Sequence, residues 1–161
     1  NMEVICKTAE VKVSKGAEVD VEINASSDLS FSSAGTSKTF INVKANSLTL
    51  ASSGSSTVEA VVDVEDMKVD NSGMSNVKVV SGKTGSLQVD ASGSAKFNSG
   101  DVVIPTAYMI QSGSSKSLVN VSDTLKVNLV GNSTLEFKDN PFIDLERIVS
   151  STLTRYSESS K

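Results

Sequence analysis

The chain lacks histidine and tryptophan and has one cysteine, Cys6, among its 161 residues. Without histidine, neither a Ser/His/Asp triad nor a Cys/His pair can be assembled. Zinc and copper sites built on imidazole or on paired thiolates are excluded as well, because the chain has no histidine and only one cysteine. Cys6 can form no internal disulfide, so we expect it to be a small buried apolar residue of the first strand.

A basic surface is missing as well. The formal net charge is −4 and the pI is ≈ 4.8, so neither nucleic acid nor anionic lipid is an expected partner. No apolar run approaches the roughly 18 residues that a membrane-spanning helix needs. Because strand-like sequence begins at once, we interpret the chain as a mature domain, in which the lack of a signal peptide says nothing about secretion.

Aromatic residues are only 4% of the chain, whereas Ser and Thr together are about a quarter. Such a composition is typical of a disordered linker. However, Val, Leu and Ile alternate with polar residues, as in residues 10–23, EVKVSKGAEVDVEI. This alternation is typical of half-buried strands. The sequence therefore predicts an all-β fold.

Seven of the ten glycines recur at nearly constant spacing, with intervals of 19, 19, 19, 20, 20 and 18 residues. After Gly16, which fits with a slip of one residue, these turn glycines are Gly35, Gly54, Gly73, Gly93, Gly113 and Gly131. An apolar residue usually stands six and four positions before each, as in Leu48 and Leu50. The position four residues after the glycine is usually apolar too, and where it is polar, at Thr39 and Ser117, an apolar residue follows immediately, Phe40 and Leu118.

Each repeat is thus a strand, a glycine-centred turn and a second strand. One such unit cannot bury its own apolar face, so successive units must stack. The repeat predicts a single-stranded parallel β-helix (solenoid) with about 19–20 residues per rung. Crossover chirality leads us to expect a right-handed coil. We predict one domain over residues 1–156, followed by a frayed tail at residues 157–161.

Serines flank the turn glycines, as at Ser53, Ser55, Ser92 and Ser94. Short hydroxyl side chains bond nearby backbone at tight turns, so we expect an external column of hydroxyls along this corner. Residues 141–156 (PFIDLERIVSSTLTRY) include a segment, residues 144–149, that could be helical, but the alternation there fits a last rung or a C-terminal cap equally well.

The segments SLQVDASGSAKF (86–97), MKVDNSGMSNVKV (67–79) and LKVNLVGNSTLEFKDNP (125–141) resemble the GIN head domain of auto-transporter adhesins. The resemblance covers nearly the whole chain. It implies a secreted or outer-surface β-helical domain, with adhesion suggested by the family's name, and it implies no catalytic residues. The chain departs from the pattern at Leu129-Val130 and at Lys116-Ser117.

Two groups of side chains are candidates for chemistry. Asp70 and Asp90 both stand three residues before a turn glycine, so stacking would place them about 5 Å apart. That spacing suits a glycosidase pair or a Ca²⁺ site, although solvated surface acids are the simpler interpretation. Five residues before the glycines, Thr49, Lys68, Gln88, Tyr108 and Lys126 would form one outward stripe. Tyr108 there could stack against a sugar, and the alternative is an ordinary solvated face.

We therefore predict a non-catalytic binding or structural domain without a cofactor or metal. Its expected partner is a cell-surface protein or a glycan, and its expected location is secreted or at the cell surface, in the outer membrane or periplasm of a Gram-negative bacterium. The alternatives are a polysaccharide-active lyase or glycosidase that uses Asp70 and Asp90, and a filament subunit that self-associates through its edge strands.

Overall fold

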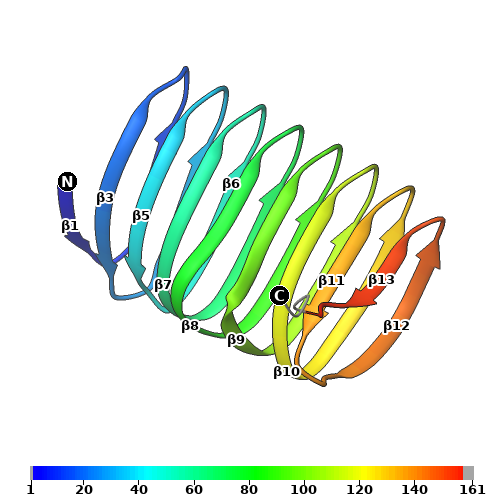
Figure 1. Cartoon of the computed structure of the whole chain (residues 1–161). Coiled ribbons are helices and arrows are strands. Elements are labelled where there is room, and N and C mark those ends of the chain that lie inside the picture. The colour runs from blue at the N-terminus through cyan, green and yellow to red at the C-terminus, as the bar shows by residue number, and fades with distance from the viewer. Residues whose placement is uncertain (1, 158–161) are drawn as a thin grey trace.

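The computed structural model describes residues 2–157 as a parallel β-solenoid of about eight turns, with no helix in that range. Figure 1 shows sharp corners aligned along one edge of the coil and broader bends along the other. The strands are β1 (Met2–Cys6), β2 (Ala9–Val13), β3 (Glu18–Ala25), β4 (Asp28–Ser33), β5 (Lys38–Lys44), β6 (Ser47–Ser52), β7 (Thr57–Asn71), β8 (Asn76–Ala91), β9 (Lys96–Gln111), β10 (Lys116–Val130), β11 (Thr134–Lys138), β12 (Phe142–Val149) and β13 (Thr152–Arg155).

The strands form two faces, which we call sheet I and sheet II. Sheet I holds the strands that precede the sharp corners: β2, β4, β6, the second halves of β7 to β10, and β12. Sheet II holds the strands that follow them: β1, β3, β5, the first halves of β7 to β10, β11 and β13. Every pairing is parallel. The repeat predicted from the glycine spacing is thereby confirmed.

The core lies between the two sheets and consists of stacked aliphatic columns. Leu48, Met67, Leu87 and Leu125 belong to one register column of sheet I, and each is at most 2% exposed. Each side chain of this size contributes about 1.5–3 kcal/mol when it is fully buried. Because side chains alternate along a strand, the residues between them point to solvent. The core positions predicted six and four residues before the turn glycines are confirmed.

The turn glycines form the sharp corner. All six from Gly35 to Gly131 have φ between 69° and 83°, a region that residues with a Cβ rarely adopt. From Gly54 onward, an added Cβ would also lie within 2.6–2.9 Å of the carbonyl oxygen of the preceding turn glycine. At the first corner, Lys15, with φ 60°, lies beneath Gly35, and Gly16, with φ 73°, follows it. This is the one-residue slip in the sequence pattern.

Two columns of polar side chains follow the corner, one on the outside and one on the inside. The side chains that hydrogen-bond to each other belong to the inner column. Residues two before and two after the turn glycines are buried in pairs: Ser33 with Ser37, Ser52 with Ser56, and Asn71 with Ser75. The first two pairs hydrogen-bond through their hydroxyls at 2.8 Å, and the Ser75 hydroxyl donates to the Asn71 side-chain oxygen. The serines predicted to be external lie next to the glycines, and those that follow the turn are exposed. The sequence pattern found the outer column and missed the inner one.

Phe40 and Leu118, the apolar neighbours of two polar positions, do not take the place of those positions in the core. Thr39 and Ser117 themselves point inward and are buried, whereas Phe40 is 39% exposed. The stacked rungs hold the register, and a slip of one residue would turn every side chain of the strand to the other face. Ser117 is compensated by Gln111, whose amide nitrogen donates to the Ser117 hydroxyl at 2.7 Å.

We predict that substitutions at Gln111 and Ser117 are strongly coupled in their effect on the free energy of unfolding. Ser117→Val removes the acceptor of the fully buried Gln111 amide and should lower the free energy of unfolding by about 1–3 kcal/mol. The double variant Gln111→Met/Ser117→Val removes both polar groups and should recover most of that loss. Urea unfolding of the chain, of Ser117→Val, of Gln111→Met and of the double variant measures the coupling. Simple additivity of the two single changes would contradict this account.

Residues 141–156 form the last rung instead of a helix. β12 pairs with β10 through a bulge between Val127 and Asn128, and β13 pairs with β11. The predicted tail falls mostly on residues 158–161, which lie outside the described residues. In the described part of the chain, no strand pairs with the far side of β12. In Figure 1 it is the outermost strand at the end opposite β1.

Candidate functional site

The stripe predicted from the sequence exists on the outer face of sheet I. Thr49, Lys68, Gln88, Tyr108 and Lys126 are consecutive register partners on β6 to β10. Thr49 and Lys68 are exposed, and the other three are half-buried. Adjacent members of such a column lie about 4.8 Å apart. The stripe is therefore a continuous row of polar groups across five rungs, with one aromatic ring in it.

A shallow groove of about 290 Å³ runs beside the first four members of this stripe. The residues that line it are Ser47, Leu48, Thr49, Asp66, Met67, Lys68, Ser86, Leu87, Gln88, Thr106 and Tyr108. Its walls thus combine hydroxyls, an amide, a carboxylate and an ammonium group with the ring of Tyr108 at one end. The Ser86 hydroxyl donates to Asp66 within this wall.

Tyr108 belongs to a polar cluster that the sequence pattern missed. Its hydroxyl donates to Glu146 at 2.6 Å, and the Asn128 amide donates to the same carboxylate oxygen at 3.3 Å. Lys126 Nζ lies 3.5 Å from the other Glu146 oxygen and 5.0 Å from the centre of the Tyr108 ring. Glu146 is the extra residue of the β12 bulge, which lies off the glycine repeat. This cluster fixes the orientation of Tyr108 against Lys126.

The same contacts shift two pKa values. The hydrogen bond to Glu146 is the largest cause that raises the pKa of Tyr108 above its usual 10.0, followed by desolvation. The hydrogen bond from Tyr108 is the largest cause that lowers the pKa of Glu146. Both directions follow from one fact: the bond needs a protonated phenol and an ionised carboxylate.

We predict that Glu146→Gln lowers the pKa of Tyr108 toward its ordinary value. The neutral amide no longer disfavours the phenolate, so the phenol should lose its proton at lower pH than in the unmodified chain. Alkaline titration of the phenolate absorbance in a Tyr156→Phe background follows Tyr108 alone, since the chain has two tyrosines. Glu136→Gln on sheet II is the matched control and should leave the titration unchanged. An equal shift in both variants would show that Glu146 is not the cause.

The two aspartates predicted as a pair are register partners on β7 and β8. Their column continues through Ala51 on one side and Ile110 on the other. Lys68 Nζ lies 4.0 Å from Asp70, on the exposed face of the sheet. The groove beside the stripe is lined by neither Asp70 nor Asp90. The pair therefore lacks the acid-lined groove with a cationic base that the catalytic alternative needs, and the structure does not support that alternative.

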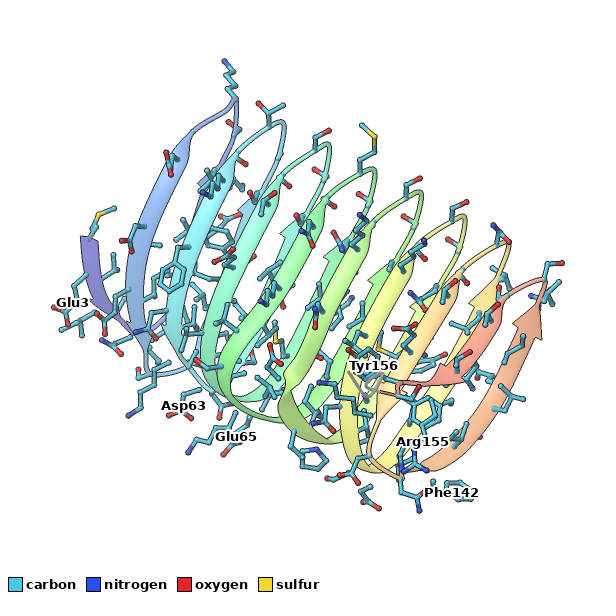
Figure 2. All side chains as sticks on the ribbon, viewed as in Figure 1. Glu3, Asp63, Glu65, Phe142, Arg155 and Tyr156 are labelled. Atoms are coloured by element: carbon cyan, nitrogen blue, oxygen red, sulfur yellow. The ribbon has the colours of Figure 1, made fainter. Side chains whose placement is uncertain are left out.

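A larger open groove of about 890 Å³ lies at the broad bend, on the edge opposite the turn glycines. Its charged lining residues are Lys44, Asp63, Glu65, Asp66 and Lys83, and Figure 2 shows Asp63 and Glu65 projecting from this edge. Lys83 Nζ lies 3.4 Å from Asp63. Because both signs of charge are mixed along its walls, the groove has no single charge that would select a ligand.

Three further findings concern metal sites, membrane-spanning helices and the cysteine. Within residues 2–157, no three His, Cys, Asp or Glu side chains gather where they could hold a metal ion. In the same range, no helix is suited to crossing a membrane. Cys6 is a free cysteine of β1 that packs against the core, but it is half-buried, whereas the sequence analysis expected a buried residue of the first strand.

These features define a class: a β-solenoid that presents extended, exposed sheet faces with shallow polar grooves. A family model described as "Putative auto-transporter adhesin, head GIN domain" matches residues 3–141. The chain belongs to this family, which confirms the resemblance seen in the Ser-Gly-Ser turns. No curated protein matches the chain, and no solved structure matches it.

Proposed function

We propose that this chain is a non-catalytic binding domain of an adhesin, secreted or displayed at the cell surface of a Gram-negative bacterium. The family to which it belongs supports adhesion. The solenoid supports it physically, because stacked rungs repeat the same outward positions and so build an extended surface in place of a closed cleft. The outer membrane or the periplasm is the compartment that this proposal implies.

The observation that carries the proposal is the in-register stripe beside a groove on sheet I. We propose a glycan as the ligand. Sugar hydroxyls need closely spaced donors and acceptors, which Thr49, Lys68 and Gln88 supply in one row. A sugar ring also packs on an aromatic side chain, and Tyr108 supplies one at the end of the groove, where it is already held by Glu146.

A glycan array probed with the 161-residue chain tests the proposal. Tyr108→Ala and Gln88→Ala should each weaken binding of any glycan retained by the parent chain, by about 10-fold or more for the loss of a ring contact or of buried hydrogen bonds. Tyr108→Phe keeps the ring and should retain most of the binding. Lys96→Ala on sheet II is the control that should bind normally. Absence of any glycan ligand, or equal loss in the control, would overturn the assignment to this face.

A further inference from the structure

The end of the solenoid formed by β12 is an open edge with an apolar surface. Phe142, Leu145, Ile148 and Val149 of this strand are 37–72% exposed, and Figure 2 shows Phe142 pointing away from the coil. Within the described residues, β12 bonds only to β10, so its outer peptide groups have no strand partner. Open edges of this kind pair readily with another strand. Four large apolar residues on one strand mark an interaction surface.

Two charged residues of β12 are complementary to the same two residues in a second copy of the strand. Asp144 and Arg147 both lie on the outer face of sheet I, because they are register partners of Lys126 and Asn128. Among the described residues, neither forms a salt bridge. If a second β12 is laid antiparallel to the first, so that Asp144 of one copy faces Arg147 of the other, Phe142 faces Val149 and Ile143 faces Ile148. Each pair occurs twice about the two-fold axis, which gives two charged pairs and four apolar pairs. The two members of every pair lie on the same face of the sheet.

We propose that β12 is a dimer interface, in which two copies of this chain join end to end about a two-fold axis. The axis passes between Leu145 and the bulged Glu146, so Leu145 of each copy faces Glu146 of the other, and the new ladder consists of one run of three residues on each side of this centre. Glu146 is already held by Tyr108 and Lys126 and is not left uncompensated there. A two-fold contact of this kind uses the same patch on both copies and closes without further growth.

The opposite arrangement, a head-to-tail filament, is disfavoured by the same charges. Through the continuous register columns of sheet I, Asp144 corresponds to Glu10 of β2 and Arg147 to Lys12. Stacking β2 of one copy on β12 of the next would therefore oppose like charges directly, which is destabilising. Glu10 and Lys12 also bond to each other at 2.7 Å, so the two charges of β2 are already paired.

Charge reversal tests the dimer with its own internal control. Asp144→Arg and Arg147→Asp each oppose like charges across the axis and should raise the dimer dissociation constant roughly 10- to 100-fold. Mixing the two variants restores both opposite-charge pairs, so the mixture should dimerise although neither variant does alone. The double variant Asp144→Arg/Arg147→Asp should dimerise like the parent chain. Sedimentation equilibrium measures all four, and circular dichroism checks that each is folded.

Lys12→Glu at the other end is the matched control and should leave the dimer unchanged. A parent chain that stays monomeric at every concentration, or a mixture that associates no better than its components, would overturn the proposal. Tighter association of Arg147→Asp alone would instead show a head-to-tail contact with Lys12. The glycan assay is separate from this test, since the monomeric variants keep the stripe and the groove intact.

Discussion

Gly113→Ala should lower the free energy of unfolding by about 2–5 kcal/mol, a large share of the stability of a chain of this size. Two costs add at this residue. Its φ of 69° costs an alanine about 1–2 kcal/mol. The new Cβ would also lie 2.6 Å from the carbonyl oxygen of Gly93, and relieving such overpacking costs about 1–3 kcal/mol more. Thermal or urea unfolding of the two proteins measures the difference.

Lys15→Gly is the matched substitution for Gly113→Ala: it introduces a glycine at the corner and should stabilise the chain. Lys15 pays the conformational cost of φ 60°, about 1–2 kcal/mol. It escapes the overlap, because no earlier sharp corner lies beneath it in the described residues. Glycine removes the conformational cost but adds about 0.5–1 kcal/mol of unfolded-chain entropy. We therefore expect a net gain of about 0.5–1 kcal/mol. If Gly113→Ala and Lys15→Gly both proved neutral, the corner would not depend on left-handed residues at all.

The fold could be predicted from the sequence because its repeat is one-dimensional. Each turn glycine is required twice, by its φ and by the glycine beneath it, so the spacing of Gly54, Gly73 and Gly93 carries the pitch of the coil directly. Once the pitch is known, alternation within each strand decides which residues face inward. The stripe from Thr49 to Lys126 was predictable for the same reason, since it depends only on pitch and alternation.

The rest could not be predicted because it departs from the repeat. Glu146 reaches Tyr108 through a bulge in β12, and a bulge shifts the register without a glycine to mark it. The inward serines at Ser33 and Ser37 were not predicted, because a buried hydroxyl that finds a partner carries no sequence signature different from an exposed one. The position of a residue in the repeat predicted which residues lie above and below it in the stack, but not which side chains form hydrogen bonds with it.

Gly82→Ala should destabilise the chain by about 3–5 kcal/mol or more, although Gly82 lies outside the regular glycine spacing. Its φ is 113°, and an added Cβ would fall 1.8 Å from the backbone oxygen of Val62. β8 bulges just before this point: Ala60 pairs with Val79 and Val61 with Ser81, so Val80 is an extra residue. The bulge presses the Gly82 backbone against β7. Accepting a side chain would require β7 and β8 to separate beside fully buried Val62.

Gly85→Ala is the control within the same broad bend. Gly85 does not have a positive φ, and its added Cβ would approach the Glu65 oxygen only to 3.0 Å, so we expect a cost of about 1 kcal/mol or less. Urea unfolding compares the two variants, and native-state hydrogen exchange locates the damage. In Gly82→Ala, the amides of β7 and β8 should lose protection first, because each rung contacts only its neighbours. Equal costs for the two substitutions would mean that β7 and β8 yield at this bend, and that the close approach at Gly82 is not a fixed feature of the coil.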